Sequence, residues 1–147
     1  MKKVALLVDG ENMIMARDFS IDLEQIEEAA KKHGSLQIKE VFLPKSVKDS
    51  TMDYVTVSGF HALGCSHPDT EMIVRGTEIA ISRKYNEIAI IALATRDEDF
   101  TPVVHKIKEY NKTSVNITVP IKFSKGLTKA ADYCEFIEPL ERKEKEV

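Results

Sequence analysis

The sequence has few of the residues that would place it in a specialised class of protein. Its 147 residues include no tryptophan and two cysteines, and no apolar stretch reaches membrane-spanning length. Cys65 and Cys134 lack the paired spacing of a metal finger, so we interpret them as free thiols. The start of the chain has no signal-peptide pattern either. The expected setting is therefore reducing and cytoplasmic, with no membrane partner.

The chain also lacks an excess of positive charge and a glycine-rich phosphate loop. Its net charge is −3 and its pI about 5.8, so no bulk field draws it to nucleic acid. Enzymes that bind nucleotide cofactors through glycine-rich loops are disfavoured. A nucleic-acid substrate stays compatible with this charge if metal ions offset an acidic site.

What is present is an ordinary globular composition, 43% hydrophobic and 31% charged. This length and composition predict one domain, residues 1–140, followed by a charged C-terminal tail at residues 141–147.

One stretch combines a buried strand with an acidic turn. Residues 88–94 are continuously apolar, which is typical of a strand buried on both faces in a parallel sheet. Asp97 and Asp99 follow directly. Thr101 and Pro102 come next and predict a helix cap and a first helical turn. Because ligands of open α/β sheets bind beyond the carboxyl ends of the strands, these acids mark a candidate site.

A second apolar run, residues 4–8, also ends in an acid, Asp9, followed by Gly10 and Asn12. The remaining patterns predict helices near residues 22–33, 69–83 and 127–133, strands at 36–43, 61–65, 114–119 and 135–137, and a helix or strand at 52–60. This order indicates an α/β fold with a parallel sheet. If the strands ending at Asp9 and Asp97 are adjacent, their carboxylates converge, and Asp69 at a helix start could join them. Such acids repel one another, and Mg²⁺ or Mn²⁺ resolves the repulsion.

Two of these motifs resemble a known family. Val-Asp-Gly-Glu-Asn at residues 8–12 and Thr-Arg-Asp-Glu-Asp-Phe-Thr-Pro at residues 95–102 are similar to NYN domains, a branch of the PIN-like, metal-dependent ribonucleases. Residues 69–80 and 127–132 match as well, so the resemblance spans nearly the whole chain. It implies a Rossmann-like, three-layer α/β/α fold with a central, mostly parallel sheet. It also implies an acidic Mg²⁺ or Mn²⁺ pocket that hydrolyses RNA.

The resemblance also implies roles for individual residues. Asp9, Asp97 and Asp99 would be metal ligands and catalytic acids, and Asp69 would be a fourth catalytic acid. The residues expected to contact substrate are Asn12, Thr95, Arg75, Arg96 and Thr101. Asn12 and Thr95 would also support the acids.

Three positions depart from the family pattern. Arg75 stands where the family usually has another aspartate, Arg96 where it tends to have glycine, and Thr95 where it tends to have serine. We expect Arg75 to reach the acidic pocket, where it would replace part of the metal's charge or hold a phosphate. It could equally mark a site that binds RNA without cutting it.

Simpler interpretations stay open for the acids. Asp69 is explained equally well as an acid favoured by a helix dipole, and Asp99 as a helix cap. The sequence thus predicts a cytoplasmic, metal-dependent ribonuclease that acts on single-stranded or structured RNA. The alternative is a non-catalytic RNA-binding or adaptor domain that keeps the acidic pocket. Homodimerisation is left open.

Overall fold

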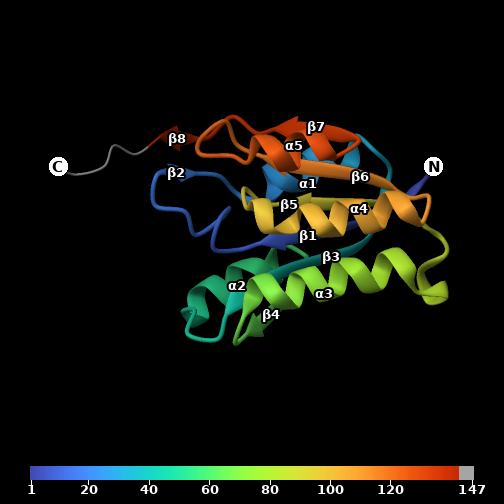
Figure 1. Ribbon diagram of the computed structural model, residues 1–147. Helices are drawn as coiled ribbons and strands as arrows, with labels where there is room; N and C mark the ends of the chain where they lie inside the picture. Colours follow the sequence, from blue (N-terminus) through green and yellow to red (C-terminus); the bar gives the residue numbers. More distant parts are fainter. Residues whose placement is uncertain (143–147) are drawn as a thin grey trace.

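Strand β1 (Lys3–Asp9) lies in the middle of a six-stranded sheet in the computed structural model, which describes residues 1–142 (Figure 1). The strand order is β4-β3-β1-β5-β6-β7, and every neighbouring pair in this sheet is parallel. The other strands are β3 (Ser35–Pro44), β4 (His61–Cys65), β5 (Ile88–Ala94), β6 (Thr113–Thr118) and β7 (Tyr133–Phe136). The predicted α/β fold with a parallel sheet is confirmed.

Helices cover both faces of this sheet and make the three layers seen in Figure 1. One face carries α1 (Leu23–Lys31) and α2 (Asp49–Val57), and the other carries α3 (Pro68–Ile81), α4 (Thr101–Glu109) and α5 (Lys125–Ala130). Two short 3-10 turns, η1 (Arg83–Tyr85) and η2 (Glu98–Phe100), flank β5. The open alternative at residues 52–60 is resolved in favour of a helix, α2.

The apolar run of β1 is buried on both sides because its side chains alternate between two cores. Val4, Leu6 and Val8 belong to the core beneath α1, whereas Ala5 and Leu7 pack with α3 and α4. All five side chains have no exposed surface. This burial explains why the run shows no polar alternation, as expected for a central strand of a parallel sheet.

Two sequence predictions need correction, and one short strand was not predicted. Residues 141–142 are not a tail: they form β8 (Glu141–Arg142), which pairs antiparallel with β2 (Phe19–Ser20), a strand that the sequence did not predict. The rest of the predicted tail, residues 143–147, lies outside the described residues. Helix α5 begins earlier than predicted, because the Ser124 hydroxyl caps it by accepting from the Leu127 amide.

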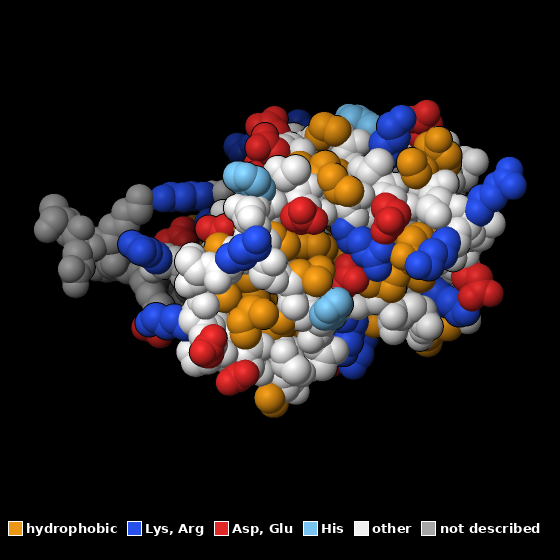
Figure 2. Space-filling view, turned by 90° about the horizontal axis from the view of Figure 1, so that it is seen from below, with side chains coloured by type: hydrophobic (Ala, Val, Ile, Leu, Met, Phe, Trp, Pro, Cys, Tyr) orange, Lys and Arg blue, Asp and Glu red, His pale blue; other side chains and the backbone are white. Residues whose placement is uncertain are grey.

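Figure 2 shows the face that carries α2, α3 and β4, on which acidic and basic side chains are interspersed with apolar ones. Among the apolar side chains, Val57 and Val74 are more than half exposed. No helix among residues 1–142 is both long enough and apolar enough to cross a membrane.

Candidate active site

The predicted acids at the ends of β1 and β5 lie next to each other. These two strands are neighbours, and Val8 pairs with Ala94, so Asp9 and Thr95 leave the sheet at the same level. From β1 the chain moves outward to β3 and β4 on one side and then returns to β5 on the other side of β1, so the strand order reverses between β1 and β5. In open parallel sheets, that point is where ligands bind.

A hydroxyl group links the two acids. The Thr95 side chain, fully buried, donates to Asp9 Oδ2 at 2.8 Å, and its Oγ1 accepts from the Asp97 amide at 3.1 Å. Asn12 Nδ2 donates to the same Asp9 oxygen at 2.7 Å, and the Asn12 amide lies 3.4 Å from Oδ1. Asn12 and Thr95 therefore both hydrogen-bond the Asp9 carboxylate, and their contact with substrate stays a prediction.

The Asp9 carboxylate is 5% exposed, and this burial raises its pKa above the ordinary value of 3.8. Hydrogen bonds from Asn12 and Thr95 oppose the rise. The negative charge of Asp97 adds to it, because two like charges lie close together. A desolvated carboxylate with a second acid beside it favours a bound cation.

The turn after β5 is built by Asp97 and Thr101. Asp97 Oδ1 accepts from the Asp99 amide at 2.9 Å and so caps η2. Thr101 is the first residue of α4 rather than its cap, and its hydroxyl donates to the Glu98 carbonyl at 2.7 Å. The prediction of a Thr101 cap is wrong, because η2 intervenes between the acids and the helix. A contact of Thr101 with substrate stays a prediction.

Gly10 fixes the start of the loop that follows β1. Its amide donates to the Phe42 carbonyl at 3.0 Å. A Cβ at this position would lie 2.5 Å from Leu43 Cδ2 and 2.8 Å from the Phe42 oxygen, so only glycine fits without movement. The loop carrying Asn12 therefore starts in close contact with β3.

Asn116, in the middle of β6, supports the site and was not predicted from the sequence. Its side chain is 1% exposed and donates to the Leu93 and Thr95 carbonyls, at 3.1 and 3.2 Å. It thereby fixes the end of β5 beneath Asp97. A side-chain amide inside a buried strand was the available signal, because buried polar groups require partners.

Arg96 packs against the loops that surround the end of β5. Its guanidinium donates to the Asn12 and Ile121 carbonyls, pairs with Asp18 and lies over the Phe19 ring. The Arg96 side chain is 12% exposed. Its Nε and Nη1 therefore donate to acceptors within the protein, and a contact of Arg96 with substrate stays a prediction.

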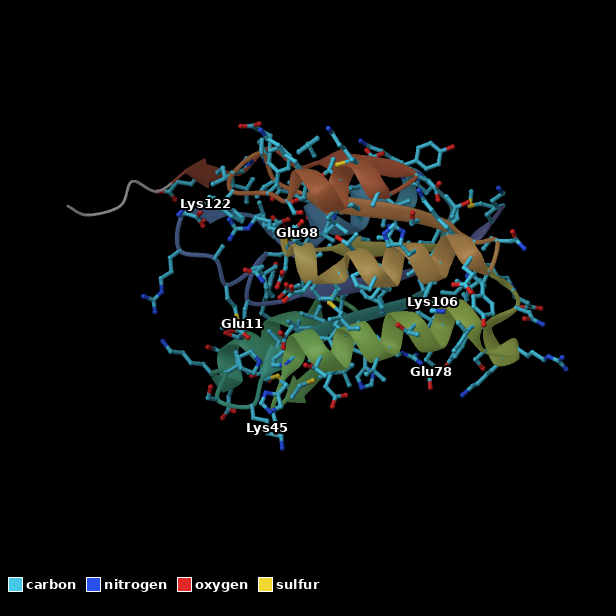
Figure 3. The ribbon with its side chains drawn as sticks, viewed as in Figure 1. Glu11, Lys45, Glu78, Glu98, Lys106 and Lys122 are labelled. Atoms are coloured by element: carbon cyan, nitrogen blue, oxygen red, sulfur yellow. The ribbon has the colours of Figure 1, made fainter. Side chains whose placement is uncertain are left out.

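Arg75 also faces away from the acids. Its Nε and Nη2 donate to the two Glu40 carboxylate oxygens at 2.8 and 3.1 Å, and Nη1 donates to Tyr85 and Glu78. Tyr85 precedes β5, at the amino edge of the sheet. In Figure 3, Glu78 lies apart from Glu98, nearer the end of the molecule at which the strands begin. Glu98 is the residue that follows Asp97 in the sequence. The prediction that Arg75 reaches the acidic pocket is wrong.

Asp69 and Asp99 are exposed acids at the same edge, since they lie at the start of α3 and in η2. Within residues 1–142, no three His, Cys, Asp or Glu side chains are grouped closely enough to hold a metal ion. The donors present fit a hydrated Mg²⁺ or Mn²⁺, because Mg²⁺ is commonly bound through one or two carboxylates and keeps several waters. They do not fit an ion enclosed entirely by protein ligands.

This fold and site agree with the family comparison. The sequence profile of the NYN domain matches residues 3–138, and the chain belongs to the NYN domain family. NYN domains have a PIN-like nuclease fold, and such nucleases generally depend on metal ions and act on RNA.

The chain is also similar to one curated protein and to one solved structure. An uncharacterized protein of Methanocaldococcus jannaschii is 35% identical over 132 residues, which cover 89% of this chain and 53% of that protein. The chain thus spans about half the length of this archaeal relative. A crystal structure of a protein of unknown function from Vibrio parahaemolyticus is 21% identical, with a TM-score of 0.77, over 92% of this chain and 93% of that one. This likeness shows the fold.

Proposed function

We propose that this chain is a metal-dependent ribonuclease whose site is formed by Asp9 and Asp97. The observation that supports this most strongly is the Thr95 hydroxyl, which bonds both the Asp9 carboxylate and the backbone amide of Asp97 where the strand order reverses. Membership of the NYN family supports RNA as the substrate class. Single-stranded RNA is the form we propose, because its backbone can bend to reach acids recessed at a strand end.

Asp9 and Asp97 would hold Mg²⁺ or Mn²⁺, and Asp99, the third predicted ligand, would stay an exposed acid beside them. Bound there, the ion would supply Lewis-acid chemistry, making water a better nucleophile and offsetting charge on the phosphodiester. Asp9 Oδ2 already accepts two short hydrogen bonds. Oδ1 has only the 3.4 Å contact with the Asn12 amide, so it is the oxygen with capacity for a cation.

The chain's own residues would orient the acids and guide the substrate. Asn12 and Thr95 hold the plane of the Asp9 carboxylate, so that it does not have to reorganise when a cation binds. Figure 3 shows Lys45 and Lys122 at the same end of the molecule as Glu11 and Glu98. Lysines in these strand-end loops would contact phosphates and position the RNA without reading its sequence.

One observation favours the second candidate, a non-catalytic RNA-binding domain. Among the described residues no three acids are grouped as ligands, and two acids hold an ion more weakly than a larger set. Such a domain would bind RNA through the same loops. It would gain affinity when an acid near the phosphates is neutralised.

The substitution Asp97→Asn separates the two candidates. Asparagine keeps the size and can still accept from the Asp99 amide, so the fold should persist while the charge is lost. For the nuclease we expect loss of Mn²⁺-dependent cleavage of single-stranded RNA by at least about a hundredfold. Lys106→Gln, a change on the exposed side of α4, is the control and should leave cleavage unchanged. Wild-type protein that binds RNA but never cuts it, with Mg²⁺ or Mn²⁺ present, would reject the nuclease.

A further inference from the structure

Arg96 lies where three loops leave the carboxyl edge of the sheet. It follows β5 itself, its Nε donates to the Asn12 carbonyl at 3.0 Å, and its Nη1 donates to the Ile121 carbonyl at 3.1 Å. Asn12 belongs to the loop after β1, and Ile121 to the loop after β6. One partly buried cation therefore bonds the backbones that follow three neighbouring strands.

Further contacts fix the plane of the guanidinium. Asp18 Oδ2 lies 3.3 Å from Nη1, and the Arg96 Cζ lies 4.7 Å from the centroid of the Phe19 ring. Phe19 is 1% exposed and belongs to β2, so the ring is itself held by the protein. A planar, multidentate donor suits such a set of acceptors, whereas a lysine ammonium would be a single point of contact.

Asn12 connects this junction to the candidate active site. Its carbonyl accepts from Arg96, while its side-chain amide donates to Asp9 Oδ2. When the Asn12 backbone is fixed, the direction of its side-chain amide is restricted as well. Asp9 has only one other short hydrogen bond, from Thr95, so its orientation depends strongly on Asn12.

We propose that Arg96 is a positioning residue: it clamps residues 10–18 against the ends of β5 and β6, so that Asn12 orients Asp9 for a divalent cation. The cation part of this inference rests on the proposed function. The clamp itself is a property of the protein without metal. The arginine that departs from the family pattern thereby serves the site through the loop backbone rather than by touching substrate.

Amide hydrogen exchange tests the clamp in metal-free protein. The Met13 and Met15 amides donate to the Asp9 and Gly10 carbonyls, so they report on the order of the clamped loop. Arg96→Met should speed their exchange at least about tenfold, and Arg96→Lys should fall between that variant and wild type. Arg17→Met removes the same charge from an exposed position in the same loop and should change neither amide. Unchanged protection in Arg96→Met would overturn the clamp.

Calorimetric titration with Mn²⁺ tests the route through Asn12. Loss of a residue that orients a ligand typically weakens metal binding by about 10–100-fold, which is our expectation for Arg96→Met. In an Asn12→Ala background the amide is already gone, so Arg96→Met should cause little further loss. A purely structural role would weaken affinity equally in both backgrounds and would overturn the route. A wild type without Mn²⁺ affinity would reject the proposed function and the cation part, while hydrogen exchange still decides the clamp.

Discussion

Arg75 and Arg96 both turn their guanidinium groups into the protein, yet they bind different kinds of acceptor. Arg75 pairs with the carboxylates of Glu40 and Glu78, away from the candidate active site. Arg96 donates mainly to backbone carbonyls of loops that adjoin Asp9 and pairs with Asp18 alone. Pairing with carboxylates neutralises charge within the fold, whereas donation to loop carbonyls fixes loop shape. We therefore assign Arg75 to stability and Arg96 to the geometry of the site.

The largest effect that this comparison predicts is a loss of stability in Arg75→Met. The Glu40 side chain is 10% exposed, and the substitution leaves its charge buried without its bidentate partner. We expect the free energy of unfolding to fall by about 2–3 kcal/mol, less than for a fully buried pair because Arg75 is partly exposed. Denaturant unfolding measures this, with exposed Arg83→Met as a near-neutral control. The Mn²⁺ affinity of Arg75→Met should equal that of wild type. A variant with altered Mn²⁺ affinity and unchanged stability would contradict the assignment of Arg75 to stability.

A second prediction isolates the cause of that loss. Adding Glu40→Leu to Arg75→Met removes the unpaired buried charge and supplies an apolar side chain instead. Buried ion pairs are often replaced by apolar residues at little cost, so we expect the double variant to regain more than half of the lost stability. A double variant no more stable than Arg75→Met would mean that packing of the arginine stem, not charge, was lost.

The smallest predicted effect concerns Asp9 and pH. Because its pKa is raised in the folded protein, the folded state holds the proton more tightly than the unfolded chain does. The contribution of Asp9 to stability therefore falls as pH rises from below 3.8 through the folded pKa. In metal-free protein, Asp9→Asn should raise the melting temperature by a few degrees at pH 7. It should give no gain at pH 3, where Asp9 is protonated in both states; an equal gain at both pH values would contradict this.

Much of the fold was predictable because its central strands consist of continuous apolar runs. Residues 4–8 and 88–94 are buried on both faces, and each run is followed directly by an acid or an acidic turn. Two such strands in a parallel sheet direct their carboxyl ends to one edge, which is why the meeting of Asp9 and Asp97 could be expected. The role of Asp69 and Asp99 as further acids of this site stays a prediction.

The contacts of the two arginines could not be predicted for a physical reason. Arg75 binds Glu40, which is 35 positions earlier in the chain, and nothing in the local pattern of either residue specifies the partner. Arg96 binds the carbonyls of Asn12 and Ile121, and a carbonyl group is present at every position of a sequence. Strands β2 and β8 have two residues each, too few for a periodicity to be visible.

The central claim is that Asp9 and Asp97 together bind a divalent cation, and a crystal soaked in Mn²⁺ tests it most directly. We expect an anomalous scattering peak at the ends of β1 and β5, within bonding distance of a carboxylate oxygen from each residue. The same soak of Asp97→Asn should give a weaker peak or none. Full Mn²⁺ soaking with no peak between these two carboxylates, or a peak bound only at other surface acids, would contradict the account.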